Sequence, residues 1–204
     1  MKTEIIKIKT DNPDLEKIKY AAYALKKGKL VVFPTETVYG IAANAKNKKT
    51  MARLRSLKNR PNAPFSFHIA VKSDLKKLNC IIDKRASELT KKFWPGPLTL
   101  VLTTRSGRNI GVRMPSHPVA LALLKEAKLG IVAPSANFKN KLPATTASQA
   151  FKDLKGLVDI IIDSGKTKVG VSSTVLDLTQ SPARILREGS VTKKEIEKAL
   201  KGLK

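Results

Sequence analysis

Short apolar runs, alternating with amphipathic stretches, constrain the fold of this chain most strongly. "LVVF" (30–33), "IVAP" (131–134) and "DIIID" (159–163) are nearly continuous apolar segments bounded by polar residues. Such runs are typical of strands buried on both faces, because a strand with one solvated face alternates apolar and polar side chains. We therefore predict an α/β protein with a central mixed sheet and flanking helices.

Terminal signals help to delimit the predicted elements. Asn12 is the expected N-cap of the first helix, Pro13 its first residue and Gly28 its end. Thr192 and Glu195 form a capping box at the start of the last helix. The predicted helices cover 11–29, 50–58, 83–94, 117–130, 146–156 and 192–202, and the predicted strands cover 4–9, 30–33, 65–71, 98–104, 109–114, 131–133, 158–163, 172–178 and 183–188.

Length and composition indicate one domain spanning 1–204, because 42% of the 204 residues are hydrophobic and can form a sizeable core. The single cysteine, Cys80, excludes an intramolecular disulfide framework and a multi-cysteine metal site. No segment approaches the roughly 20 apolar residues that span a bilayer, and no signal peptide is evident. We expect a cytoplasmic protein without a membrane partner.

The charge is strongly unbalanced. Forty Lys and Arg residues against 16 Asp and Glu residues give a net charge of +24. Such a charge attracts polyanions, namely nucleic acid, nucleotides or an anionic membrane surface. The alternative is a lysine-rich solvated surface, since the basic residues are scattered. We favour contact with RNA or a nucleotide.

Several common catalytic signatures are missing from the sequence. It contains no G-x-x-x-x-G-K-[ST], no G-x-G-x-x-G after a strand and no H-E-x-x-H, and it has two histidines. No G-x-S-x-G segment marks a serine nucleophile. A metal held by a cage of protein ligands is therefore not expected.

Polar groups follow several of the predicted strands. "FPTETVYG" (33–40) is either a turn or a ligand site at a strand end. "APSAN" (133–137) places Ser135 and Asn137 where they suit phosphate, ribose or base edges, or a polar turn. "GVSST" (170–174) adds further hydroxyl groups and leaves the same two alternatives open.

Basic side chains supply a second set of candidates. Lys58 and Arg60 lie two residues apart at a helix end, next to Pro61. If the backbone is extended there, both point the same way and could neutralise a triphosphate. The alternative is a solvated helix terminus. Arg187 is either a phosphate contact or a surface charge.

Strand alternation adds two candidates. It places Arg113 on the same face as Asn109 and Gly111, and a strand arginine beside a glycine is a candidate carboxylate clamp or one half of an ion pair. His68 lies on the less apolar face of its strand, where it could contact a ligand or be a satisfied polar residue.

The order of the motifs is more specific than any one of them. "FPTETVYG", "KNRP", "FSFHIA", "WPGPLTLVL", "GVRMPSHP", "APSAN", "GVSSTVLDL" and "ILREG" follow one another, and the chain resembles the YrdC-like family of threonylcarbamoyl-AMP synthases from about residue 15 to 190. The resemblance implies an open, twisted sheet with a concave basic surface. It also implies a nucleotidyltransferase that condenses L-threonine, bicarbonate and ATP into L-threonylcarbamoyladenylate and pyrophosphate, the first step of a tRNA modification.

The resemblance also implies roles for residues at matching positions. Thr35, His68 and Arg113 would bind L-threonine, and Glu36 could orient its amine or a water. Lys58 and Arg60 would bind the ATP phosphates and carry catalysis. Magnesium would arrive with ATP, without an organic cofactor, and tRNA or double-stranded RNA and threonylcarbamoyl-transfer proteins would be partners. The remaining nucleotide-binding residues would be Asn109, Ser135, Asn137, Ser173 and Arg187.

Two departures from the family pattern leave alternatives open. The loop between Pro61 and Pro64 is one residue shorter than in most relatives, and the chain ends soon after "REGS", so we expect the short, single-domain form. A non-catalytic RNA-binding module on the same scaffold is the main alternative. A carbamoyl-transfer function, as in hydrogenase-maturation proteins that contain this module, is less favoured.

Overall fold

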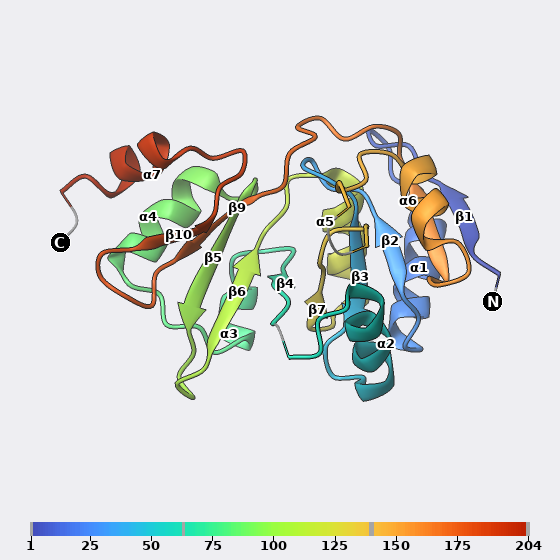
Figure 1. Ribbon diagram of the computed structural model, residues 1–204, viewed down its shortest axis with the longest axis horizontal. Coiled ribbons are helices and arrows are strands. Elements are labelled where there is room, and N and C mark those ends of the chain that lie inside the picture. The colour runs from blue at the N-terminus through green and yellow to red at the C-terminus, as the bar shows by residue number, and fades with distance from the viewer. Residues whose placement is uncertain (1, 63, 139–140, 203–204) are drawn as a thin grey trace.

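A computed structural model describes residues 2–62, 64–138 and 141–202. Its strands form one mixed ten-stranded sheet in the order β1-β8-β2-β3-β7-β4-β6-β5-β9-β10 (Figure 1). The predicted mixed sheet with flanking helices is therefore confirmed. The strands are β1 (Glu4–Lys7), β2 (Val31–Phe33), β3 (Gly40–Asn44), β4 (Phe67–His68), β5 (Leu98–Thr103), β6 (Asn109–Arg113), β7 (Ile131–Val132), β8 (Ile160–Asp163), β9 (Thr174–Asp177) and β10 (Arg184–Arg187).

Helices cover the half of the sheet that contains β1, β8, β2 and β3 on both faces (Figure 1). In β2, Val31 and Phe33 pack into a core with α1 and α5, whereas Val32 packs into a second core with α2 and α6. This confirms that the continuous apolar run is buried on both faces. The helices are α1 (Leu15–Lys26), α2 (Lys48–Lys58), α3 (Asp74–Lys77), α4 (Lys84–Phe93), α5 (Pro118–Ala127), α6 (Ala147–Leu154) and α7 (Lys193–Leu200).

In the other half of the sheet, one face of β5 packs against helices and the opposite face lines a cavity. In β5, Leu98, Leu100 and Leu102 pack into a third core with α4 and α7. The alternate residues Thr99 and Val101 line a cavity instead. Two-residue strands, β4 and β7, join the two halves, and residues from both halves line the cavity.

Several predicted boundaries are wrong. The first helix is capped by Asp14, whose side chain accepts from the amides of Glu16 and Lys17, so Asn12 and Pro13 lie before it. The predicted strand 65–71 reduces to Phe67–His68. Beyond it, the amides of Ala70 and Val71 donate to Asp74 in the turn that leads into α3.

Strand β3 was not predicted. Its sequence, "GIAAN", is rich in residues with low strand propensity, but β3 pairs antiparallel with β2 on one side and β7 on the other. Phe33 pairs with Gly40, so the polar stretch between them is the connection of a β-hairpin. The capping box at Thr192 and Glu195 is present as predicted.

Candidate active site

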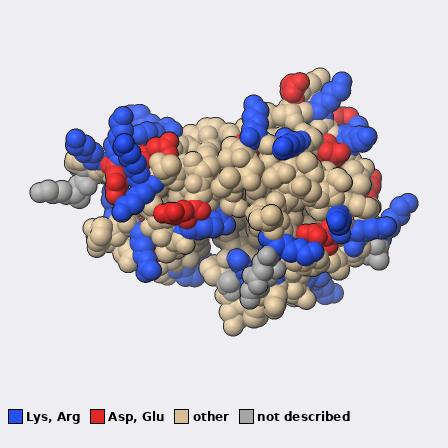
Figure 2. Space-filling view, turned by 45° about the horizontal axis from the view of Figure 1, so that its top comes forward, with Lys and Arg blue, Asp and Glu red and all other residues tan. Residues whose placement is uncertain are grey.

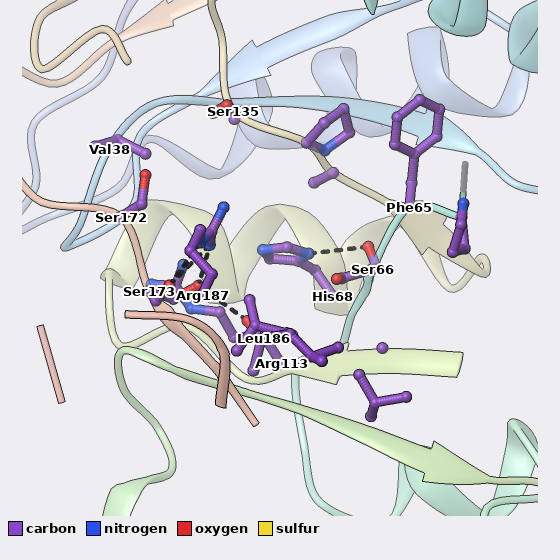
Figure 3. Close-up of a pocket in the computed structure, with 18 of the residues that line it drawn as sticks. Val38, Phe65, Ser66, His68, Arg113, Ser135, Ser172, Ser173, Leu186 and Arg187 are labelled. Atoms are coloured by element: carbon purple, nitrogen blue, oxygen red, sulfur yellow. Dashed lines mark hydrogen bonds between the residues drawn. The ribbon is translucent and has the colours of Figure 1, made fainter. Parts of the chain in front are cut away.

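A cavity of about 490 Å³ lies over the exposed side of β5, β6 and β9, bounded by the segments that follow β2 and β7 (Figure 3). Two residues given a site role, Asn137 and Glu36, do not line it. The other nine line it: Thr35, Lys58, Arg60, His68, Asn109, Arg113, Ser135, Ser173 and Arg187.

Arg113 projects from β6 and is buried. Its Nη2 donates to Oε1 of Glu36 at 2.7 Å, and its Nε donates to the carbonyl oxygen of Gly96 at 3.2 Å. Of the two alternatives drawn from the sequence, the ion pair is therefore present, although Arg113 also lines the cavity. Burial lowers the pKa of Arg113, and the negative charge of Glu36 opposes that shift.

The glycine beside Arg113 accommodates another side chain. A Cβ atom at Gly111 would lie 2.6 Å from Oγ and 3.2 Å from Cβ of Ser66, so a larger residue would force the Ser66 side chain to move. Ser66, at the cavity wall, therefore occupies the space beside this glycine, and the carboxylate clamp stays a prediction.

His68 is buried in the wall formed by β4 (Figure 3). Its ring is nearly perpendicular to the ring of Phe33. Burial, and then the positive charge of Arg113, lowers the pKa of His68 to about 3. Its Nδ1 lies 3.4 Å from the carbonyl oxygen of Ser66, which can only accept a hydrogen bond. The lowered pKa favours the neutral ring, and this contact favours the tautomer with its proton on Nδ1, which leaves Nε2 as an acceptor.

Lys58, the last residue of α2, is buried, with 3% of its surface exposed to solvent. Its Nζ donates to the carbonyl oxygen of Ser135 at 3.0 Å and to the backbone carbonyl and side-chain Oδ1 of Asn137. Asn137 therefore fixes the position of the Lys58 ammonium group, which lines the cavity. Burial, and then the charge of Arg60, lowers the pKa of Lys58 to about 8.

Arg60 reaches the cavity differently from the prediction. Asn59 has a left-handed backbone conformation with φ of +46°, so the segment from Lys58 to Arg60 is not extended. Both side chains nevertheless line the cavity, and Arg60 remains exposed to solvent.

Arg187 and Ser173 form the opposite wall (Figure 3). Nη2 of Arg187 donates to the carbonyl oxygen and to Oγ of Ser173, at 2.8 and 3.0 Å. Gly189 allows the chain after Arg187 to pass close to the backbone of Ser172, because a Cβ atom there would lie 2.2 Å from the carbonyl oxygen of Ser172. Partial desolvation, and then the charges of Arg113 and Arg60, lowers the pKa of Arg187. A bound anion would relieve this repulsion between cations.

Sequence reasoning missed part of the floor of the cavity. Thr99 and Val101 of β5, with Val175 and Asp177 of β9, line it alongside Asn109. The strands pair in register, with Thr99 opposite Val175 and Val101 opposite Asp177. The alternation within "LTLVLT" and "TVLD" carries this signal, but only once the two strands are known to be neighbours.

Within the described part of the chain, no group of three or more His, Cys, Asp or Glu side chains could hold a metal ion. In the same residues, no helix combines the length and apolarity required to cross a membrane.

The fold and cavity define a class: a mixed α/β domain with a cation-rich pocket over β5, β6 and β9. The sequence matches the family Sua5_yciO_yrdC, described as "Telomere recombination", over residues 23–189. The chain belongs to this family.

Two relatives and one solved structure illustrate the relationship. The threonylcarbamoyl-AMP synthases of Pyrococcus abyssi (strain GE5 / Orsay) and Bacillus subtilis (strain 168) are 43% and 40% identical over 90% and 93% of this chain. The chain spans 57% of the length of each. A solved structure of P. abyssi Sua5 complexed with L-threonine matches with a TM-score of 0.91 and 41% identity, covering 97% of this chain and 61% of that one.

Proposed function

We propose that the chain is a threonylcarbamoyl-AMP synthase, a nucleotidyltransferase that makes L-threonylcarbamoyladenylate and pyrophosphate from L-threonine, bicarbonate or CO2, and ATP. The observation that carries the proposal is the convergence of nine predicted site residues on one cavity. The likeness to a threonine-bound relative supports it.

The chemistry requires no covalent residue of the protein. The threonine amine attacks CO2, or bicarbonate with loss of water, and forms a carbamate after losing a proton. A carbamate oxygen then attacks the α-phosphorus of ATP, and the bond to the pyrophosphate leaving group breaks. The nucleophile is a substrate, so the protein must position three reactants and stabilise phosphate charge.

The cavity walls suit different parts of this reaction. Arg113, Thr35 and neutral His68 lie on the strands and hairpin at one side, where they would receive the amino acid. Because His68 carries no charge, it would not repel the substrate ammonium group as an imidazolium would. We infer that Arg113 binds the carboxylate through charge-assisted hydrogen bonding.

Lys58, Arg60 and Arg187 would hold the triphosphate, with Asn109, Ser135 and Ser173 as polar contacts and Asn137 supporting Lys58. Magnesium would enter with ATP, bound mainly by phosphate oxygens and water. A phosphate oxygen would compete for the Lys58 hydrogen bonds that the carbonyl oxygens of Ser135 and Asn137 now accept.

We further propose a cytoplasmic role in tRNA processing, with threonylcarbamoyl-transfer proteins downstream and tRNA or double-stranded RNA as a contact. The net charge of +24 supports the RNA contact. In the face drawn in Figure 2, Lys and Arg gather towards both ends while the middle is mostly neutral. The continuous basic concave surface stays a prediction.

The test is pyrophosphate release by the purified protein with ATP, magnesium and bicarbonate, in the presence of L-threonine, L-serine or no amino acid. Release that requires L-threonine supports the proposal. A folded protein that releases none would overturn it, and strongly salt-dependent RNA binding by that protein would favour the non-catalytic alternative.

A further inference from the structure

The guanidinium group of Arg113 is largely committed to the protein itself. Nε donates to Gly96, and Nη2 donates both to Oε1 of Glu36 and to Oγ1 of Thr37, the latter at 2.9 Å. Among the described residues, Nη1 has no hydrogen-bond acceptor. A ligand carboxylate would therefore find one free nitrogen instead of the two-nitrogen fork of an unconstrained arginine.

Both carboxylate oxygens of Glu36 also accept hydrogen bonds from the protein itself. Its Oε1 accepts from Arg113, and its Oε2 accepts from the backbone amide of Ser116 at 3.1 Å. Both side chains of the ion pair are at least nine-tenths buried. Glu36 thus connects β6 to the segment before α5. Its side chain is buried and is not part of the cavity lining, which does not favour the role expected from the sequence, orienting the amine or a water.

Thr37 links this ion pair to Thr35. The two threonine hydroxyl groups lie 2.9 Å apart, and the Thr35 hydroxyl donates to the carbonyl oxygen of Val38 at 2.6 Å. Because each hydroxyl has one proton, Thr37 must donate to Thr35 while it accepts from Arg113. The hydrogen bonds therefore run in one direction, from Arg113 through Thr37 to Thr35.

We propose that Glu36 and Thr37 are positioning residues, which fix Arg113 with Nη1 towards the cavity and connect it to Thr35. For L-threonine binding, this inference rests on the proposed function. It predicts that removal of the Thr37 hydroxyl weakens recognition of the amino acid and leaves recognition of ATP nearly unchanged, because the network lies on the amino-acid side of the cavity.

The kinetic test uses Thr37→Val, which keeps the shape and removes the hydroxyl, and Thr37→Ser, which restores it. We expect Thr37→Val to raise KM for L-threonine about tenfold, with KM for ATP within about twofold, and Thr37→Ser to recover most of the loss.

The matched control is Thr50→Val. Thr50 is also buried, and its hydroxyl donates to the carbonyl oxygen of Gly28 at 2.7 Å, away from the cavity lining. Equal effects of Thr37→Val and Thr50→Val, or parallel rises in both KM values, would overturn the proposal.

A second readout does not depend on catalysis. In ¹⁵N NMR, restricted rotation about the Cζ–Nη2 bond of Arg113 reports its hydrogen bonds, and the signal is assigned by its loss in Arg113→Lys. We expect slow rotation in the wild type and faster rotation in Thr37→Val and Glu36→Gln. Unchanged rotation in folded Thr37→Val would contradict the positioning role. If the wild type lacked threonine-dependent chemistry, the proposed function would fail, but this measurement would still decide whether the network orients Arg113.

Discussion

The ammonium group of Lys58 donates hydrogen bonds to both carbonyl groups of Asn137, which lies 79 residues further along the chain. This contact closes one corner of the cavity, because it fixes the end of α2 against the segment that follows β7. Lys58 is thus both a structural anchor and a buried cation beside the place proposed for the triphosphate.

Replacing Lys58 with alanine should lower threonine-dependent pyrophosphate release by about 100-fold, since a positioned charge that stabilises the transition state is lost. Steady-state kinetics on purified Lys58→Ala measures the effect. Lys48→Ala removes an exposed lysine from the first turn of the same helix and should stay within about twofold of the wild type. Near-normal turnover in Lys58→Ala would remove Lys58 from the catalytic machinery.

The pH dependence should follow the lowered pKa of Lys58. Its ammonium group loses the proton as the pH rises through about 8, compared with an ordinary value of 10.5. We expect kcat/KM for ATP to fall above about pH 8, because this parameter reports ionisation in the free enzyme. Between about pH 8 and pH 10.5, Lys58 binds more protons in the unfolded chain than in the folded protein. In this range, Lys58 therefore makes the free energy of unfolding rise with pH. A flat profile of kcat/KM up to pH 9.5 would contradict the assignment.

The ion pair between Glu36 and Arg113 should contribute more to stability than any exposed pair. Glu36→Ala leaves a buried guanidinium without its carboxylate and should lower the free energy of unfolding by about 3–5 kcal/mol. Denaturant unfolding measures this change. Glu16→Ala, which removes the partner of exposed Lys19, should cost much less, because solvent screens an exposed ion pair. Similar losses in the two variants would show that the buried pair has no special role.

The order of the motifs revealed the site more fully than local periodicity revealed the fold. Nine candidate residues reach one cavity, although Lys58, Arg113 and Arg187 come from elements far apart in the sequence. The sequence could not show how these cations are partnered. Glu36 contacts Arg113 across 77 residues, and such a contact depends on which strands become neighbours.

Errors in the predicted elements have local physical causes. Strand β3 contains alanine and glycine, so its pairing partners determine its conformation more than its propensity does. The strand predicted over 65–71 is shortened where Asp74 accepts hydrogen bonds from the backbone amides of the next turn. Both effects depend on tertiary or medium-range contacts that an alternation pattern does not record.

His68 should remain neutral between pH 5 and 8. Its pKa is lowered to about 3, so its imidazole signals in ¹H–¹³C NMR should show no titration between pH 5 and 8, with His68→Asn providing the assignment. The unfolded chain binds a proton at this residue near its ordinary pKa of 6.5, so His68 makes stability fall as the pH decreases below that value. A midpoint near 6.5 in the folded protein would show that the ring is solvated and would contradict its place in the buried wall.

The central claim is that this cavity joins threonine, a one-carbon unit and an adenylate. The most direct measurement is mass spectrometry of the reaction mixture after incubation with ATP, magnesium, L-threonine and ¹³C-bicarbonate. We predict an adenylate that contains threonine and one ¹³C atom, absent from reactions of Lys58→Ala and from those without L-threonine. A folded, active-site-intact protein that yields only unlabelled nucleotides would contradict the account.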